Sequence, residues 1–343
     1  MNAFAAYHAI NTKLHSRSRV LLSKEDWQKV FSYETVGQLI EFLKKHHGYN
    51  RYLEHTKIEE LHRGDLEIIF NRYLVEEIEA LLGYFSGPYK AFFKTLLIRY
   101  EIYDLELLLR SIVRNENVEL MGQHFVHSKK HATMPYQKLL AAKNIHQLID
   151  ALKGTPYYEV LKTTTVEDVV KREFHMEMKL ETLFYKLVME QAKRLKEKDQ
   201  KIIRNMMGFK VDCLNIQWIY RAVKYYDISR EEILVYSLPG GMLSFNGLKK
   251  LVYAKNETEF KHLAHKHLKS DVFDKVEDAF LEKALDRLLL QHIKSDKDEE
   301  SIAKPLSYIY RLQIEIKDLT AATEGIRYGL DAYEIKKYLV STV

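Results

Sequence analysis

Acidic side chains recur in this sequence at helical spacing and are candidates for acid–base catalysis. Three pairs are separated by three residues: Glu101 and Asp104, Asp212 and Asn215, and Glu315 and Asp318, with an amide as the second member of the middle pair. An α-helix places such a pair on one face, where two carboxylates could serve as general acid and general base. Arg110 and Arg221 follow the first two pairs at the same distance. Because an enzyme seldom needs one site three times, we interpret these residues as structural, bonding a neighbouring loop or helix, and predict no catalytic residue.

Histidines could hold a metal ion, and the sequence contains 15 of them. Two groups are closely spaced: His124, His127 and His131, and His262, His265 and His267. A helix would place the first group on one side, but no carboxylate accompanies it at ligand spacing, and Lys129 and Lys130 would repel a cation. We therefore predict a solvated linker over residues 124–131, with no metal and no cofactor. A metal-dependent helical enzyme is kept as an alternative.

Phosphate-binding and metalloprotease motifs are missing from the sequence. It contains no GxxxxGK[ST] run, no GxGxxG run after a strand and no HExxH run. The run LPGG at residues 238–241 could form an anion nest, but it opens no lysine-bearing helix. We interpret that run as a linker.

Glycine and proline are scarce, at 13 and 5 of 343 residues. Barrels, sandwiches and Rossmann-type folds need many turns, so this composition predicts an all-α protein.

The net charge of +5 permits an acidic partner without demanding nucleic acid. The single cysteine, Cys213, fits a reducing compartment. Because no long apolar run and no secretion signal are seen, we expect a soluble protein.

The sequence repeats itself. Three similar runs occur at residues 28–40 (QKVFSYETVGQLI), 137–149 (QKLLAAKNIHQLI) and 249–261 (KKLVYAKNETEFK). The acidic pairs recur in the same order, with a period of about 110 residues, which is the size of a small domain. These repeats predict three homologous units: residues 1–117, 118–230 and 231–343.

Helical periodicity is clearest in the first unit. It predicts an amphipathic helix over residues 25–45 and a second over residues 66–82. A long helix is expected from Pro88 to about Arg114, since a proline after Gly87 favours a helix start. Three such helices joined by short loops predict a small bundle for each unit.

At the triple acidic signature the chain resembles a known family. It is similar to the rotor subunit called d in eukaryotic V-type ATPases and C in archaeal and bacterial A/V-type ATPases. Four segments carry the resemblance: residues 101–110, 212–221, 238–241 and 308–340. The last, YIYRLQIEIKDLTAATEGIRYGLDAYEIKKYLV, is the most specific, and the resemblance covers essentially the whole chain.

The resemblance implies an all-helical, funnel-like protein of three similar three-helix bundles arranged with pseudo-threefold symmetry. Such a subunit has no catalytic site and is cytoplasmic, peripheral to the membrane. It is implied to lie in the central stalk, between the central-shaft subunits and the membrane rotor ring, where it links ATP hydrolysis or synthesis to proton or sodium transport. No nucleic acid and no small-molecule substrate are implied.

Two hypotheses about surfaces follow from this use. We expect polar and charged side chains to line a central cavity, because a rotary complex that disassembles reversibly cannot leave a large apolar pocket open to water. We also expect basic residues at the surfaces that meet an acidic shaft or ring. The alternative of another class is a helical scaffold or adaptor unrelated to ATPases.

Overall fold

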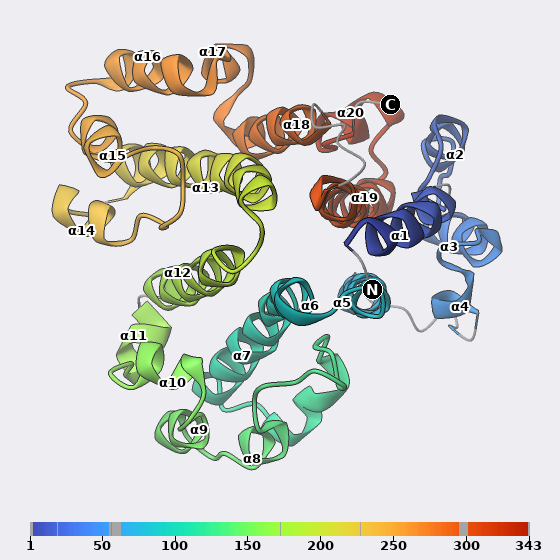
Figure 1. Cartoon of the computed structure of the whole chain (residues 1–343), viewed down its shortest axis with the longest axis horizontal. Helices are drawn as coiled ribbons and strands as arrows, with labels where there is room; N and C mark the ends of the chain where they lie inside the picture. The colour runs from blue at the N-terminus through green and yellow to red at the C-terminus, as the bar shows by residue number, and fades with distance from the viewer. Residues whose placement is uncertain are drawn as a thin grey trace.

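The chain is described from a computed structural model, which covers residues 3–18, 20–54, 56, 63–171, 173–226, 228–294 and 301–341. Every regular element within these residues is a helix (Figure 1), which confirms the predicted all-α class. None of the described helices is both long and apolar enough to cross a membrane.

The helices of the first half alternate between short and long segments. In chain order they are α1 (Ala3–Ser18), α2 (Lys24–Val30), α3 (Val36–Lys45), α4 (Asn50–Leu53), α5 (Arg63–Leu82), α6 (Gly87–Thr95), α7 (Ile98–Val113), the 3-10 helix η2 (Val118–His124), α8 (Tyr136–Leu140), α9 (Ile145–Ala151), α10 (Pro156–Leu161) and α11 (Val166–Lys171).

The second half contains the longest helices. They are α12 (Glu173–Ala192), α13 (Glu197–Tyr225), α14 (Arg230–Val235), α15 (Phe245–Val252), α16 (Glu257–Leu268), α17 (Val272–Lys275), the 3-10 helix η3 (Asp278–Phe280), α18 (Leu281–Lys294), α19 (Ala303–Arg327) and α20 (Ala332–Lys337).

The prediction of one helix over residues 25–45 is wrong. Two helices, α2 and α3, occupy this stretch, and each begins at its own capping box, at Ser23 and at Thr35. The Thr35 side chain accepts the Gln38 N–H at 3.3 Å, while the Gln38 side chain accepts the Thr35 N–H at 3.3 Å. Because this reciprocal pair satisfies the free donors of a new helix start, the chain turns before Val36 although the apolar period continues.

Of the other two helices predicted in the first unit, the one over residues 66–82 is present, whereas the single long helix is wrong in part because it is divided in two. Residues 66–82 lie in α5, and the predicted long helix over 88–114 corresponds to α6 and α7. A turn at Leu96 and Leu97 separates these two helices. Gly87, the first residue of α6, has a φ of +53°, a conformation that glycine adopts without strain, and Pro88 follows it in the first turn.

Three long helical segments begin beside one another near the middle of the molecule. Asp199, in the first turn of α13, is buried and accepts a hydrogen bond from the Tyr89 hydroxyl of α6. Asp199 also accepts the Ile302 N–H at 2.9 Å, and Ile302 precedes α19. One carboxylate therefore joins the amino-terminal ends of α6, α13 and α19. Figure 1 shows these helices and α12 around the middle, with α2–α4, α8–α10 and α14–α17 farther out.

The two ends of the chain pack together. Helix α19, near the carboxyl terminus, contacts α1, α3, α5 and α20. Figure 1 shows the blue amino-terminal helices beside the red carboxyl-terminal ones. The last long helix therefore supplies the core against which the first short helices lie.

Candidate functional site

Asp104 is completely buried on α7 and binds the backbone of the following segment. Its carboxylate accepts the N–H groups of Val126 at 2.8 Å and His127 at 3.1 Å. The His127 ring lies 2.7 Å away through Nδ1, and the Tyr136 hydroxyl donates at 3.1 Å. A carboxylate with several donors can remain in an apolar core because hydrogen bonds replace the water that it has lost.

Asn215 and Asp318 occupy the same repeat position as Asp104, and they bind backbone in the same way. Asp318 accepts the N–H groups of Val340 at 2.6 Å and Ser341 at 2.8 Å. Asn215 accepts the Leu238 N–H at 2.7 Å and donates to the Leu238 carbonyl at 3.0 Å. In all three cases the bound backbone lies 22 or 23 residues farther along the chain. Burial raises the pKa of Asp318.

Glu101 and Asp212 are the first members of their pairs. Glu101 accepts the Thr133 N–H at 2.6 Å and the Tyr157 hydroxyl at 2.7 Å. Asp212 accepts the Leu243 N–H at 3.1 Å and lies 2.7 Å from Nε2 of His267. Both carboxylates thus bind a backbone amide just before a short helix and a ring group from a later element.

Glu315, the third first member, finds its partners at the other end of the chain. It accepts the Leu22 N–H at 2.8 Å and the Tyr49 hydroxyl at 2.6 Å. Leu22, Thr133 and Leu243 each lie four to six residues before the similar runs that begin at residues 28, 137 and 249. The three bonds are therefore equivalent, and the third connects α19 to the amino-terminal segment. Burial raises the pKa of Glu315 to about 7.

The two arginines of the signature lie apart from these carboxylates. Arg110 Nη1 is 3.3 Å from Glu177, and Arg221 Nη2 is 4.0 Å from Glu282. The six other signature residues are between 0% and 6% exposed. Their oxygens face donors of this chain, so a substrate in solvent does not reach them in this conformation.

The prediction of a solvated linker over residues 124–131 is wrong for its central histidine. The His127 ring is stacked on Tyr136 with 3.5 Å between ring centroids, and its side chain is 8% exposed. Lys129 and Lys130 are exposed, as expected. No group of three metal-ligating side chains occurs among the described residues. The histidines His127 and His267 instead bind signature carboxylates.

A cavity of about 510 Å³ lies between the long helices and is lined from α5, α7, α12, α13, α18 and α19. Three of its residues hold one repeat position, two residues before each acidic pair: Arg99, Lys210 and Gln313. Helices α7, α13 and α19 therefore turn equivalent faces toward the same cavity. These three residues were not among the predicted site residues, although a polar residue at a fixed distance before each acidic pair is visible in the sequence.

The cavity wall is charged. The Arg99 guanidinium forms a forked ion pair with Glu181, with 3.0 Å between Nη2 and Oε2. Lys317 Nζ lies 3.0 Å from Asp286 and 3.9 Å from Glu282. Apolar and aromatic side chains, among them Met178, Leu214 and Trp218, share the wall with these charges, so the hypothesis of a polar and charged lining holds for only part of it.

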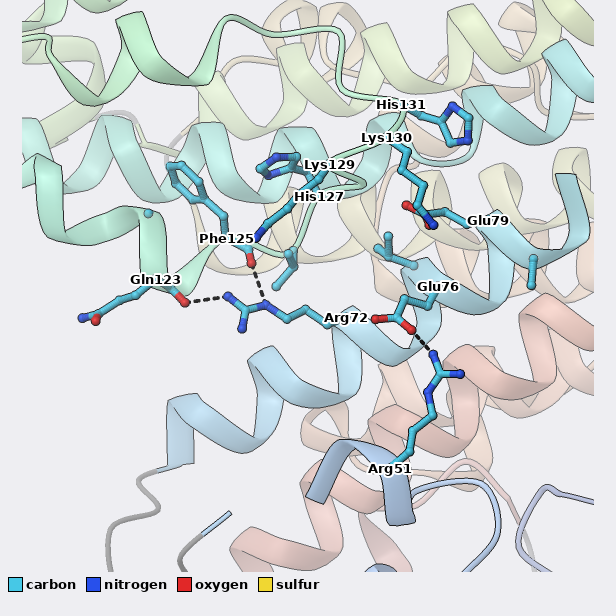
Figure 2. A pocket seen from close by; sticks show the side chains of 14 residues that line it. Arg51, Arg72, Glu76, Glu79, Gln123, Phe125, His127, Lys129, Lys130 and His131 are labelled. Carbon is cyan, nitrogen blue, oxygen red and sulfur yellow. Dashed lines mark hydrogen bonds and ion pairs between the residues drawn. The ribbon is translucent and has the colours of Figure 1, made fainter. Parts of the chain in front are cut away.

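A second pocket, of about 840 Å³, lies on the outside between α5 and the segment around η2 (Figure 2). Arg72 spans it and donates to the carbonyls of Gln123 at 2.6 Å and Phe125 at 2.9 Å. Lys130 lies 3.6 Å from Glu79, and Arg51 pairs with Glu76 across the same groove. Each of these charged side chains has a partner within the chain, and we interpret the groove as a contact between α5 and the η2 segment and not as a ligand site.

Comparison with known proteins places this architecture in a family. The profile described as ATP synthase (C/AC39) subunit matches residues 10–338. The C subunit of the A-type ATP synthase of Thermococcus onnurineus is 24% identical to this chain, over 97% of this chain and 90% of its own length. The protein of the same name from Archaeoglobus fulgidus is 24% identical, over 98% and 96% of the two chains. That from Desulfurococcus sp. is 27% identical, over 77% and 76%.

The match extends over nearly the whole chain, including all three acidic pairs. The alternative of an adaptor unrelated to ATPases is therefore wrong. The chain belongs to the ATP synthase C/AC39 subunit family, whose members are non-catalytic accessory subunits of A/V-type ATPases.

Proposed function

We propose that this protein is a socket of the central stalk, which connects the central-shaft subunits to the membrane rotor ring so that both turn together. ATP hydrolysis or synthesis elsewhere in the complex is thereby coupled to proton or sodium transport. The observation that carries the proposal is the convergence of Arg99, Lys210 and Gln313, equivalent positions of three repeats, on one cavity.

The proposal includes the arrangement of three homologous bundles, residues 1–117, 118–230 and 231–343, around a pseudo-threefold axis as a funnel. Two features support it. The amino-terminal ends of α6, α13 and α19 meet at Asp199. Three equivalent carboxylates, Glu101, Asp212 and Glu315, each bind the segment that leads into one short similar run.

A part that transmits torque must resist deformation. Helices α7, α13 and α19 are each bonded to a later segment through a buried carboxylate or amide. Such bonds are costly to break because they leave buried N–H groups unpaired. The bond from Glu315 to Leu22 extends this pattern from the last long helix to the first short ones. We propose that the signature residues make the socket stiff and that none of them reacts.

The test is a cross-link within the whole ATPase complex. Cys213 is buried, so a cysteine introduced as Gln313→Cys can be labelled with a photoactivatable maleimide. Illumination is expected to join the cavity to a shaft subunit while ATP hydrolysis and ion pumping continue, because two parts that turn together lose nothing on being joined. The control is Asp150→Cys on an exposed site of α9, which should give no shaft product.

Two results would contradict the proposal. Loss of ATP-driven pumping in proportion to the shaft product would mean that the two chains move relative to each other. A label at Gln313→Cys that reaches no shaft subunit would mean that the cavity receives something else.

A further inference from the structure

Lys210 stands out among the cavity residues because its charge is not balanced. It is half-buried on α13, and its ammonium lies 4.8 Å from the centre of the Tyr310 ring. Among the residues that the structure describes, no carboxylate forms an ion pair with it. Arg99, which holds the equivalent position in the first repeat, forms an ion pair with Glu181.

The two carboxylates that attract the charge of Lys210 are already engaged by other cations. Glu181 of α12 binds Arg99, and Asp286 of α18 binds Lys317. Four cationic side chains and two carboxylates line the cavity: Arg99, Lys210, Arg221 and Lys317, and Glu181 and Glu282. With Asp286 included, three carboxylates pair three of these four cations, and Lys210 alone is left to meet a charge that arrives from outside.

We propose that Lys210 is the residue that binds a carboxylate side chain of the polypeptide segment entering this cavity. The inference rests on the proposed function, which supplies such a segment from the shaft. A polypeptide fits better than a free anion because aromatic and aliphatic side chains share the wall with the cations, among them Tyr100, Leu214 and Trp218. A segment with an acidic residue between apolar ones matches both kinds of contact.

The surroundings of Lys210 make its protonation part of the binding. Arg99 of α7 and Lys317 of α19 repel its charge, Glu181 of α12 and Asp286 of α18 attract it, and Tyr310 of α19 faces it. Burial first, and then the two cations, lower the pKa of Lys210 to about 7. An incoming carboxylate favours the charged lysine, so the pKa rises on binding and the complex takes up a proton at pH 8.

The experiment measures binding of the full chain to the purified shaft subcomplex of the same ATPase by isothermal titration calorimetry. Titrations at pH 8 in two buffers of different ionisation enthalpy give the number of protons taken up. We expect uptake approaching one proton for the wild type and affinity that falls as the pH rises from 7 to 9. Lys210→Met should bind about tenfold more weakly and take up no proton.

Lys210→Arg provides the decisive comparison, because arginine stays charged throughout this range. It should keep the wild-type affinity at pH 7 to within a few-fold, yet take up no proton and show no loss of affinity at pH 9. Lys186→Met, at an exposed lysine of α12, should behave as the wild type does. A variant that fails to fold would be recognised by its circular dichroism, and Lys210→Arg then carries the test alone.

Several outcomes would overturn the inference. If wild type and Lys210→Arg take up the same number of protons, Lys210 is not the titrating contact, and the proposed function stands because the shaft still binds. If inorganic phosphate alone gives the same proton uptake, the site takes free anions. If the shaft subcomplex does not bind the wild type at all, the proposed function itself fails.

Discussion

The Tyr49 hydroxyl donates a hydrogen bond to the Glu315 carboxylate at 2.6 Å, across 266 residues of chain. Tyr49 is completely buried and is packed edge-on against Phe70 and Tyr73. Glu315 also accepts the Leu22 N–H, so one carboxylate joins two points of the amino-terminal segment to α19. The first short helices thus depend on a residue near the carboxyl terminus.

Removing either partner of this bond should lower the free energy of unfolding. We expect Tyr49→Phe to cost about 1–2 kcal/mol and Glu315→Ala about 2–4 kcal/mol, because the alanine leaves two buried donors unpaired. Urea denaturation of the single and double variants would give a coupling energy above about 0.5 kcal/mol. Tyr328→Phe, at a tyrosine that is 74% exposed, is the matched control. Additive effects at Tyr49 and Glu315 would show that the pair does not act as one unit.

The stability should depend on pH through Glu315. Burial raises its pKa in the folded chain to about 7 from the ordinary 4.5. The folded state therefore binds this proton more tightly than the unfolded state does. The resulting contribution of Glu315 to the free energy of unfolding is full below pH 4.5 and is lost as the pH rises through 7. Glutamine does not titrate. The difference in free energy of unfolding between wild type and Glu315→Gln should fall by on the order of 2–3 kcal/mol from pH 5 to pH 8.

The control for this pH series is Glu25→Gln, at an exposed residue of α2. The curve of this variant gives the background against which the fall for Glu315→Gln is measured. A flat curve for Glu315→Gln would mean that the Glu315 carboxylate is as easily ionised in the folded chain as in the unfolded one.

Asp318 should hold the last residues of the chain against α19. In Asp318→Asn the side-chain NH₂ group faces one of the two backbone donors, Val340 or Ser341. We therefore expect the free energy of unfolding to fall by about 1–3 kcal/mol. Amide hydrogen exchange at these two residues should become at least tenfold faster, as followed by mass spectrometry. Asp150→Asn, at an exposed aspartate of α9, should leave both quantities unchanged. Protected amides in Asp318→Asn would contradict this role.

Gly241 should tolerate no side chain. A Cβ atom there would overlap Oδ1 of Asp212, the carboxylate that accepts the Met242 and Leu243 N–H groups. Gly241→Ala must displace that carboxylate or the backbone. We therefore expect the free energy of unfolding, measured by thermal or urea denaturation, to fall by about 2–4 kcal/mol. At Gly64 in α5 a Cβ meets nothing within 4 Å, and Gly64→Ala should be neutral or stabilise by up to about 1 kcal/mol. Equal effects of the two substitutions would refute this account.

Local patterns account for what could be predicted. Scarce glycine and proline and the apolar period predicted an all-α chain, and the acidic pairs with the carboxyl-terminal stretch predicted the family; both predictions are confirmed. The single helix over 25–45 failed because the capping box at Thr35 overrides a continuing apolar period. The prediction of an exposed linker at His127 was wrong because the position of this side chain depends on Asp104, 23 residues away. The three-bundle funnel stays a proposal.

Spacing within a few turns was enough to predict the helical class, several of the helices and the repeated pair that lies on α7, α13 and α19. The backbone amides that each carboxylate binds, including the Leu22 N–H bound by Glu315, became visible only in the folded chain. The same is true of the cavity that Arg99, Lys210 and Gln313 share. Those relationships depend on how helices far apart in the chain pack, and packing is decided by shape and by the satisfaction of every buried donor together.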